Sequence, residues 1–265
     1  MPTGTKRKEA GKKADKKVVN IFIVLDKSGS MLSRTDDTID AVNNFLNEQA
    51  KDQSTRALVS MLLFSTKSNW LAKEVNIAHV DKLELNRQNY ICDGNTGLYD
   101  AVGRAASEAQ KTGSSDGIVV IVTDGGENAS TEFTLQAVKD IIMQMEQRGW
   151  SFIFLGADVN AWHVGAAMGV GAVHGVAAVS SAPYTPQAPA IAFAAASDSV
   201  SRYRSSTADL AERGATLDTS AISLRKMASV LTDEERARLN ANAAGSTTTP
   251  PAATPTNTTS TNTTP

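Results

Sequence analysis

The sequence has only one cysteine, Cys92, among its 265 residues. A single cysteine cannot form an intrachain disulfide, so a fold held together by disulfides is excluded. No apolar run reaches the roughly 18–20 residues that a membrane-spanning helix needs. The N-terminal stretch lacks the apolar segment of a signal peptide, because its lysine-rich residues run directly into a predicted strand. We therefore expect no membrane span and a cytoplasmic or virion-associated protein.

The body of the chain also lacks an excess of positive charge. The formal net charge of the whole chain is −2, yet residues 1–17 carry seven basic side chains and two acidic ones. The remainder is therefore acidic, whereas a nucleic-acid-binding body normally shows a basic face. We expect no nucleic-acid partner.

Both ends of the chain lack apolar periodicity. Residues 1–17 are polar and charged, and residues 245–265 are almost wholly Thr, Pro, Asn, Ala and Ser. Such segments cannot bury enough apolar surface to offset the entropy of ordering them, which predicts a disordered basic arm and a disordered Thr/Pro-rich tail. Between them we expect a main domain at 18–205 and a helical extension at 206–244. Within the extension, Thr232 and Glu235 have the spacing of a helix capping box.

The main domain alternates between two apolar patterns. Runs rich in β-branched residues occupy 18–25, 57–64, 117–122 and 151–155, and three of them are apolar almost throughout, as in strands buried on both faces of a parallel sheet. Helical spacing fills 39–46, 98–109 and 135–145, with Thr131 as the expected cap of the last helix. This alternation predicts a three-layer, doubly wound, Rossmann-like α/β domain with a mostly parallel central sheet flanked by helices.

Oxygen-bearing side chains follow the predicted strands at the edge where ligands bind in such sheets. Asp26, Ser28 and Ser30 come directly after the first run, Asp124 follows the run at 117–122, and Thr96 precedes a predicted helix. Each has an ordinary alternative on its own, as a turn residue or a helix cap. Together they supply two carboxylates and three hydroxyls, which suit Mg²⁺, Mn²⁺ or Ca²⁺ and suit zinc poorly. The pattern predicts one divalent metal ion.

Three segments carry a family resemblance: LDKSGSM at 25–31, TGLYDA at 96–101 and VTDG at 122–125. They resemble the von Willebrand factor A domain, in which an Asp-x-Ser-x-Ser loop, a threonine and an aspartate form the metal-ion-dependent adhesion site, or MIDAS. The resemblance implies that Asp26, Ser28, Ser30, Thr96 and Asp124 are the metal ligands. Further runs at 123–130 and 149–158 resemble a branch of bacterial and bacteriophage-encoded proteins with this domain.

The resemblance also implies a function. In the family the hydroxyls bind the metal directly, the carboxylates act partly through water, and an acidic side chain of a protein partner fills the open position. We therefore expect a metal-dependent protein-binding module that is not an enzyme, with Mg²⁺ as the favoured cation. The two tails suggest tethering within a larger assembly, such as a virion or a surface complex.

Two other functions stay open. Some relatives are adaptors that deliver substrates to an AAA+ ATPase, and nothing in this sequence separates an adaptor from an adhesin. A metal-dependent hydrolase or phosphotransferase is the other alternative. It is disfavoured because no histidine or lysine has an evident place as a general acid or base. Position 28 is also serine, where aspartate-nucleophile phosphatases have a second aspartate.

The remaining polar candidates are expected to have structural roles. The three histidines, His79, His163 and His174, lack the spacing of a zinc site, and no motif marks Cys92 as a nucleophile.

Several residues beside the predicted ligands are also assigned roles. Lys27 should point away from the metal. Asp100 lies in the first turn of a predicted helix, where it favours the helix dipole. Glu127 and Asn128 either line the rim of the site or stabilise its loop.

Overall fold

The computed structural model describes residues 16–124, 126–156, 159–170, 178–181, 188–216, 218–230, 232–235 and 237. Nearly all of the predicted basic arm, the whole Thr/Pro-rich tail, His174 and all of 238–244 lie outside these residues. None of the described helices has the length and apolar character required to cross a membrane.

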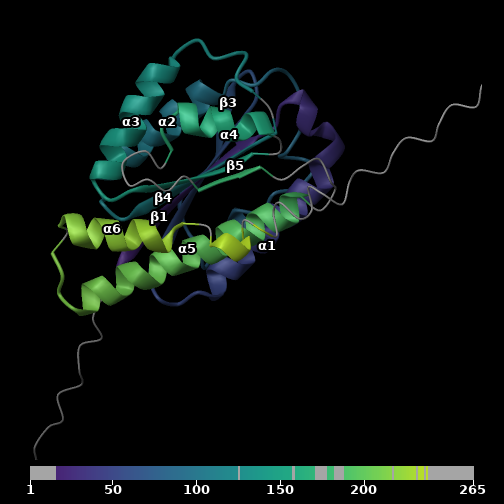
Figure 1. The fold of residues 1–265 in the computed structure, drawn as a ribbon. Helices are drawn as coiled ribbons and strands as arrows, with labels where there is room; N and C mark the ends of the chain where they lie inside the picture. The colour runs from purple at the N-terminus through teal and green to yellow at the C-terminus, as the bar shows by residue number, and fades with distance from the viewer. Residues whose placement is uncertain are drawn as a thin grey trace, which may run out of the picture.

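The described strands form one six-stranded sheet in the order β3-β2-β1-β4-β5-β6 (Figure 1). All neighbouring strands run parallel except β3, which pairs antiparallel with β2 at one edge. The strands are β1 (Val18–Asp26), β2 (Arg56–Phe64), β3 (Ser68–Asn76), β4 (Gly117–Thr123), β5 (Ser151–Gly156) and β6 (Ala178–Ser181). The predicted α/β fold with a mostly parallel sheet is therefore confirmed.

Helices cover both faces of the sheet. The α-helices are α1 (Thr35–Lys51), α2 (Leu98–Lys111), α3 (Leu135–Gln147), α4 (Val159–Ala167), α5 (Ala188–Glu212) and α6 (Thr219–Ala228). Two short 3₁₀ helices, η1 (Gly29–Arg34) and η2 (Val80–Lys82), lie in the connections. Figure 1 shows α2 and α3 on one side of the sheet and α1 and α5 on the other, with α6 beside α5.

Strand β1 shows why the sheet is buried on both faces. Ile21 and Ile23 belong to the core under α1 and α5, whereas Phe22 and Val24 belong to the core under α2 and α3. Successive side chains of a strand point to opposite faces, so a strand covered on both sides must be apolar at every position. This is the pattern that predicted the strand.

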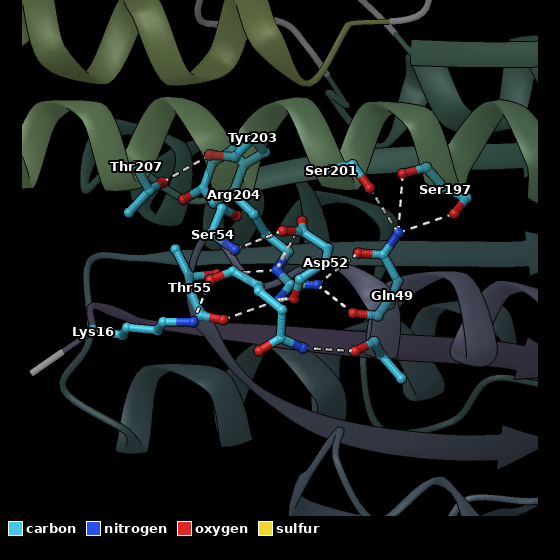
Figure 2. Close-up of polar contacts among 12 residues, drawn as sticks. Lys16, Gln49, Asp52, Ser54, Thr55, Ser197, Ser201, Tyr203, Arg204 and Thr207 are labelled. Atoms are coloured by element: carbon cyan, nitrogen blue, oxygen red, sulfur yellow. Dashed lines mark hydrogen bonds and ion pairs between the residues drawn. The ribbon is translucent and has the colours of Figure 1, made fainter.

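A buried arginine joins α5 to the end of α1 (Figure 2). The guanidinium of Arg204 is fully buried and donates to the backbone carbonyls of Gln49, Asp52 and Thr55 at 2.6, 2.7 and 3.0 Å. These carbonyls lie at or just beyond the C-terminus of α1, where helix carbonyls lack partners within the helix. Gln49 in turn donates to the Ser197 side chain at 2.9 Å. Helices α1 and α5 are thus joined by polar contacts as well as by apolar packing.

The structure corrects one predicted cap and confirms another. Thr134, rather than Thr131, caps α3, and its hydroxyl accepts a hydrogen bond from the Ala137 N–H at 3.2 Å. Thr131 instead lies in the preceding loop, where its N–H donates to Asp100. The predicted capping box is present: the Thr232 N–H donates to Glu235, and the Glu235 N–H donates to the Thr232 hydroxyl.

The C-terminal helices continue the domain without a break. Helix α5 runs through position 205, where the predicted domain ends and the predicted extension begins. Helix α6 then packs through two buried basic residues, with Arg225 paired to Asp116 and Lys226 lying 3.6 Å from Glu146. The family boundary predicted at 205 therefore falls inside a helix that packs on the sheet.

Candidate metal centre

The predicted metal loop begins at the end of β1. Asp26 is the last residue of this strand, and its side chain is fully buried. One carboxylate oxygen accepts the Ser28 N–H at 2.7 Å, and the other accepts the Thr123 hydroxyl at 2.6 Å. Thr123 ends the neighbouring strand β4. Asp26 is therefore fixed between its own loop and the adjacent strand.

A chain of hydroxyls links this loop to the second carboxylate. The Ser28 and Ser30 hydroxyl oxygens lie 3.1 Å apart, and the Ser30 hydroxyl donates to Asp124 at 2.7 Å. Four of the five predicted ligands, Asp26, Ser28, Ser30 and Asp124, are thus connected through short polar contacts at one edge of the sheet.

Thr96 is brought to the same edge by a reciprocal pair of hydrogen bonds. Its N–H donates to the Asn128 side-chain oxygen at 2.8 Å, and its carbonyl accepts the Asn128 N–H at 3.0 Å. The adjacent Gly97 N–H donates to the Ser65 carbonyl at 2.9 Å, just beyond β2. Thr96 is buried, and its loop is tied to the segment that carries Asp124.

Backbone contacts hold the metal loop from the other side. The Gly29 N–H donates to the Gly94 carbonyl at 3.0 Å, and the buried Tyr90 hydroxyl donates to the Asp26 carbonyl at 2.6 Å. Gly94 has φ +69°, and a β-carbon there would lie 2.6 Å from the Thr66 hydroxyl oxygen. Only glycine fits this position without strain.

The two carboxylates create an electrostatic conflict. Burial raises the pKa of Asp26, hydrogen bonds from Thr123 and Ser28 act in the opposite direction, and the negative charge of Asp124 raises it again. The Oδ2 atom of Asp124 is buried and makes no hydrogen bond to any described residue. Buried carboxylate oxygens are costly unless a donor or a cation compensates them. The arrangement therefore fits a divalent cation.

The neighbouring acidic residues hold the loops in place. The carboxylate of Asp100 accepts three backbone N–H groups from residues 131–133, rather than acting chiefly on the dipole of its own helix. Burial acts to raise the pKa of Asp100, but these donors and Arg104 outweigh it and lower the pKa. Glu127 likewise accepts the N–H groups of Tyr99, Ala129 and Ser130. Of the two roles expected for Glu127 and Asn128, loop stabilisation is therefore observed.

The other candidates remain outside the site. Lys27 pairs with Asp93 at 3.1 Å rather than with a predicted ligand. Cys92 is half-buried, with its sulfur 3.5 Å from the Thr35 hydroxyl oxygen. Within the described parts of the chain, no three His, Cys, Asp or Glu residues gather as a metal cluster.

An apolar pocket of about 400 Å³, a volume that includes open solvent, adjoins Asp124. Its walls include Met31, Val122, Leu155 and Phe193, which come from η1, β4, β5 and α5. The candidate metal centre therefore borders apolar surface on this side.

Sequence reasoning missed two residues that shape the centre: Tyr90 and Thr123. Thr123 had a usable signal, since it is a polar residue at the end of an otherwise apolar strand. Tyr90 lies in an irregular loop, and its contact with Asp26 depends on tertiary structure that no spacing rule reports. Asn128 was expected either at the rim or as a loop stabiliser, and only the structure shows that it contacts Thr96.

Comparison with solved structures supports the fold. The pilus adhesin SpaC from Lactobacillus rhamnosus GG, in its open conformation, is 14% identical with a TM-score of 0.54, and the match covers 73% of this chain and 31% of SpaC. The PilB minor pilin from Streptococcus sanguinis is 12% identical with a TM-score of 0.52, and the match covers 71% of this chain and 62% of PilB. At these identities the likeness shows the fold alone. No curated protein matches the chain.

The family model described as the von Willebrand factor type A domain matches residues 20–169. The match begins in β1 and includes all five predicted ligand positions, β1 to β5 and α1 to α4. Because it spans more than half of the chain, the chain belongs to the von Willebrand factor type A domain family.

Proposed function

We propose that this chain is a metal-dependent protein-binding module whose MIDAS takes an acidic side chain of a protein partner. The observation that carries the proposal is the buried Oδ2 atom of Asp124, which has no hydrogen-bond partner among the described residues and belongs to the same centre as the fully buried Asp26. A cation at this position would compensate both carboxylates. Two carboxylates and three hydroxyls are a suitable oxygen set for Mg²⁺.

The residues of the centre have different proposed roles. Ser28, Ser30 and Thr96 would bind the cation directly, and Asp26 and Asp124 would balance its charge and orient its waters. Because the hydroxyl ligands are neutral, a bound divalent cation would keep enough positive charge to attract a carboxylate from a partner. Mg²⁺ is the proposed ion, and Mn²⁺ and Ca²⁺ share its preference for oxygen.

We also propose that the centre binds without catalysing a reaction. Both carboxylate oxygens of Asp26 are engaged, by the Ser28 N–H and by the Thr123 hydroxyl, which leaves this group poorly placed as a nucleophile or base. Lys27, the nearest basic side chain in sequence, is turned toward Asp93.

The setting of the protein is part of the same proposal. The segments at 123–130 and 149–158 favour the bacterial and bacteriophage-encoded branch of the family. In that setting the module would act in the cytoplasm or in a virion, as part of a larger assembly.

The proposal is tested by titrating the metal-free chain with Mg²⁺ in a calorimeter. Asp26→Ala and Asp124→Ala should abolish Mg²⁺ binding, because each removes one of the two charges that hold the ion. Asp209→Ala changes an exposed aspartate on α5 and is the matched control. Unchanged Mg²⁺ affinity in both site variants would show that the predicted ligands are wrong.

Partner binding is tested separately by affinity capture from host extract, with Mg²⁺ or with EDTA. The proposal requires that EDTA, Asp26→Ala and Asp124→Ala each release the same captured protein. Capture that survives all three changes would show that the metal centre is not the binding surface, even if it binds Mg²⁺.

A further inference from the structure

A polar pocket lies at the opposite end of the sheet from the metal centre. Its volume is about 410 Å³, which includes open solvent, and its walls include Lys17, Ser115, Asp116, Thr216 and Arg225. Lys17 precedes β1, and Ser115 and Asp116 precede β4, whereas the metal centre lies where these two strands end. The pocket is therefore separate from the metal centre.

A buried arginine in this pocket lacks acceptors for part of its guanidinium. Arg225 is 2% exposed, and its Nη1 atom donates to Asp116. Its Nε and Nη2 atoms are buried and have no hydrogen-bond partner among the described residues. A buried N–H group without an acceptor costs free energy, and it indicates a site for a water or an ion.

The two unpartnered nitrogens belong to the same edge of the guanidinium. The group is planar, and its Nε–H and one of its Nη2–H bonds point in the same direction. This fork matches two oxygens of one oxyanion. The Asp116 pair and the Tyr203 ring, whose centre lies 5.9 Å from the guanidinium carbon, hold the plane of the group in place.

The charges in the walls of the pocket also favour an anion. Asp116 is shared by two cations, because its second carboxylate oxygen lies 2.9 Å from the Lys17 ammonium. One carboxylate against two cations leaves one positive charge unbalanced. The Lys17 side chain is 46% exposed, so it can turn toward an anion that enters from solvent.

The carboxylate of Asp116 narrows the choice of anion. It repels an oxyanion without a proton, such as sulfate, whereas it can accept a hydrogen bond from an anion that keeps a P–O–H group. A carboxylate has about four acceptor sites, so its two ion pairs leave room for this bond. Inorganic phosphate keeps a proton at neutral pH, whereas a phosphomonoester, with a second pKa of about 6, has largely lost it at pH 7.5.

We propose that this pocket binds inorganic phosphate as the hydrogen phosphate ion. The fork of Arg225 donates to two phosphate oxygens, Lys17 adds a positive charge, and the P–O–H group donates to Asp116. The hydroxyls of Ser115 and Thr216 lie in the same walls and supply further donors. Because Arg225 belongs to α6 and Asp116 precedes β4, the bound ion would tie α6 to the start of that strand.

The test is a calorimetric titration of the full-length chain with inorganic phosphate at pH 7.5. EDTA is present throughout, so that a cation in the metal centre cannot hold the anion. We expect saturable binding at one site. Arg225→Lys keeps the charge and loses the fork, and it should bind phosphate about tenfold more weakly or worse. Lys17→Gln changes no buried group and should weaken binding by about two- to fivefold.

The matched control is Lys51→Gln, which changes an exposed lysine at the end of α1 that is paired with Glu48 at 2.6 Å. It should bind phosphate with the affinity of the wild type. Sulfate and methyl phosphate are titrated in parallel, and each should bind the wild type more weakly than inorganic phosphate does.

Three results would overturn the inference. Absence of saturable phosphate binding would assign the unpartnered nitrogens of Arg225 to water. Wild-type affinity in Arg225→Lys, or in Lys17→Gln if Arg225→Lys does not fold, would place the phosphate elsewhere on the chain. Sulfate or methyl phosphate that binds as tightly as inorganic phosphate would show that Asp116 accepts no proton from the ligand. None of these results bears on the metal centre.

Discussion

The carboxylate of Asp26 is fully buried, its pKa is raised by that burial, and Asp124 places a second negative charge in the same centre. A pKa raised above the unfolded value means that the charged form of Asp26 disfavours folding at neutral pH. Below the unfolded pKa of Asp26, the group is protonated in both states and the folded chain does not carry the cost of a buried charge. The free energy of unfolding is then lost progressively as pH rises through the folded pKa. The two carboxylates that would bind the cation therefore lower the stability of the metal-free fold.

The change Asp26→Asn should separate these two effects. Asparagine has the same shape, and the Thr123 hydroxyl can rotate to accept from its amide, so the main change is the loss of the charge. In EDTA we expect melting to occur at the same temperature as in the wild type or slightly higher, with a gain on the order of 1 kcal/mol or less.

Thermal melts with and without Mg²⁺ provide the measurement. The wild type should be stabilised by Mg²⁺ through mass action, by about 2.7 kcal/mol at one hundred times the dissociation constant, and Asp26→Asn should not respond. A variant that is much less stable in EDTA, or that still responds to Mg²⁺, would contradict this account of Asp26.

Asn128 offers a second prediction at this scale, because it holds Thr96 through its side-chain oxygen. Asn128→Ala leaves the Thr96 N–H without that acceptor, and an unsatisfied buried group costs about 1–3 kcal/mol. We expect lower stability and Mg²⁺ binding weakened by about tenfold, as for other outer residues that orient metal ligands. Asn95→Ala, at an exposed asparagine in the adjacent loop, is the control for calorimetry and melting. Wild-type Mg²⁺ affinity in Asn128→Ala would show that Thr96 needs no such support.

The sequence was sufficient to predict that Asp26, Ser28, Ser30 and Asp124 lie together at one edge of the sheet, because they follow buried parallel strands. The polar residues that orient them were not predictable to the same degree. Asn128 is exposed and lies in a loop, so neither periodicity nor burial distinguishes it before the Thr96 contact is seen.

At the scale of elements, the sequence predicted the strands that are buried and missed an exposed edge strand. The strands β1, β2, β4 and β5 are nearly continuous in buried residues, and the sequence placed each to within one or two residues. Strand β3 was missed because it is an edge strand with exposed positions, Lys73 and Glu74 among them, and its pairing with β2 is irregular. Glu74 has φ +49° at this irregularity, which no regular strand pattern anticipates.

Arg204 supports a prediction about how two elements are held together. Its guanidinium donates to the carbonyls at the end of α1 and pairs with Asp52 at 3.4 Å (Figure 2). Arg204→Met would leave these carbonyls without donors and Asp52 without its partner, and removing one member of a buried pair costs about 3–5 kcal/mol. Urea unfolding followed by circular dichroism measures the loss. Arg213→Met, at an exposed arginine just beyond α5, should change stability by about 0.5 kcal/mol or less. A loss below about 1 kcal/mol for Arg204→Met would show that the apolar contacts between α1 and α5 suffice.

At the scale of the whole molecule, the polar contacts extend the domain beyond the residues that the family model matches. Tyr203 is fully buried in α5, and its hydroxyl accepts the Gly117 N–H and donates to the Gly149 carbonyl, which joins the helix to the starts of β4 and β5. Arg225 and Lys226 then attach α6 through Asp116 and Glu146. The sequence left open whether the helical extension packs on the domain or presents the tail, because α6 buries charged residues and exposes Leu224 and Met227, the reverse of the usual helical pattern.

The burial of Lys226 makes the stability of the molecule depend on pH. Burial lowers the pKa of Lys226 to about 8, against the opposing effect of Glu146 on α3. An unfolded lysine has a pKa of about 10.4, so between these values the unfolded chain holds a proton that the folded chain has released. The free energy of unfolding must therefore rise with pH across this window and fall as pH decreases through the folded pKa.

The variant Lys226→Met removes this titration while retaining a side chain of similar length. Between pH 7.5 and pH 9.5 we expect the wild type to gain about 1–2 kcal/mol relative to the variant, as measured by urea unfolding at both pH values. Effects of groups common to both chains cancel in this difference. At pH 7.5 the variant should be less stable than the wild type, because it leaves the buried Glu146 carboxylate without its cationic partner. Parallel pH profiles for the two chains would mean that Lys226 is solvated in solution and that α6 is not held against α3 as the structure has it.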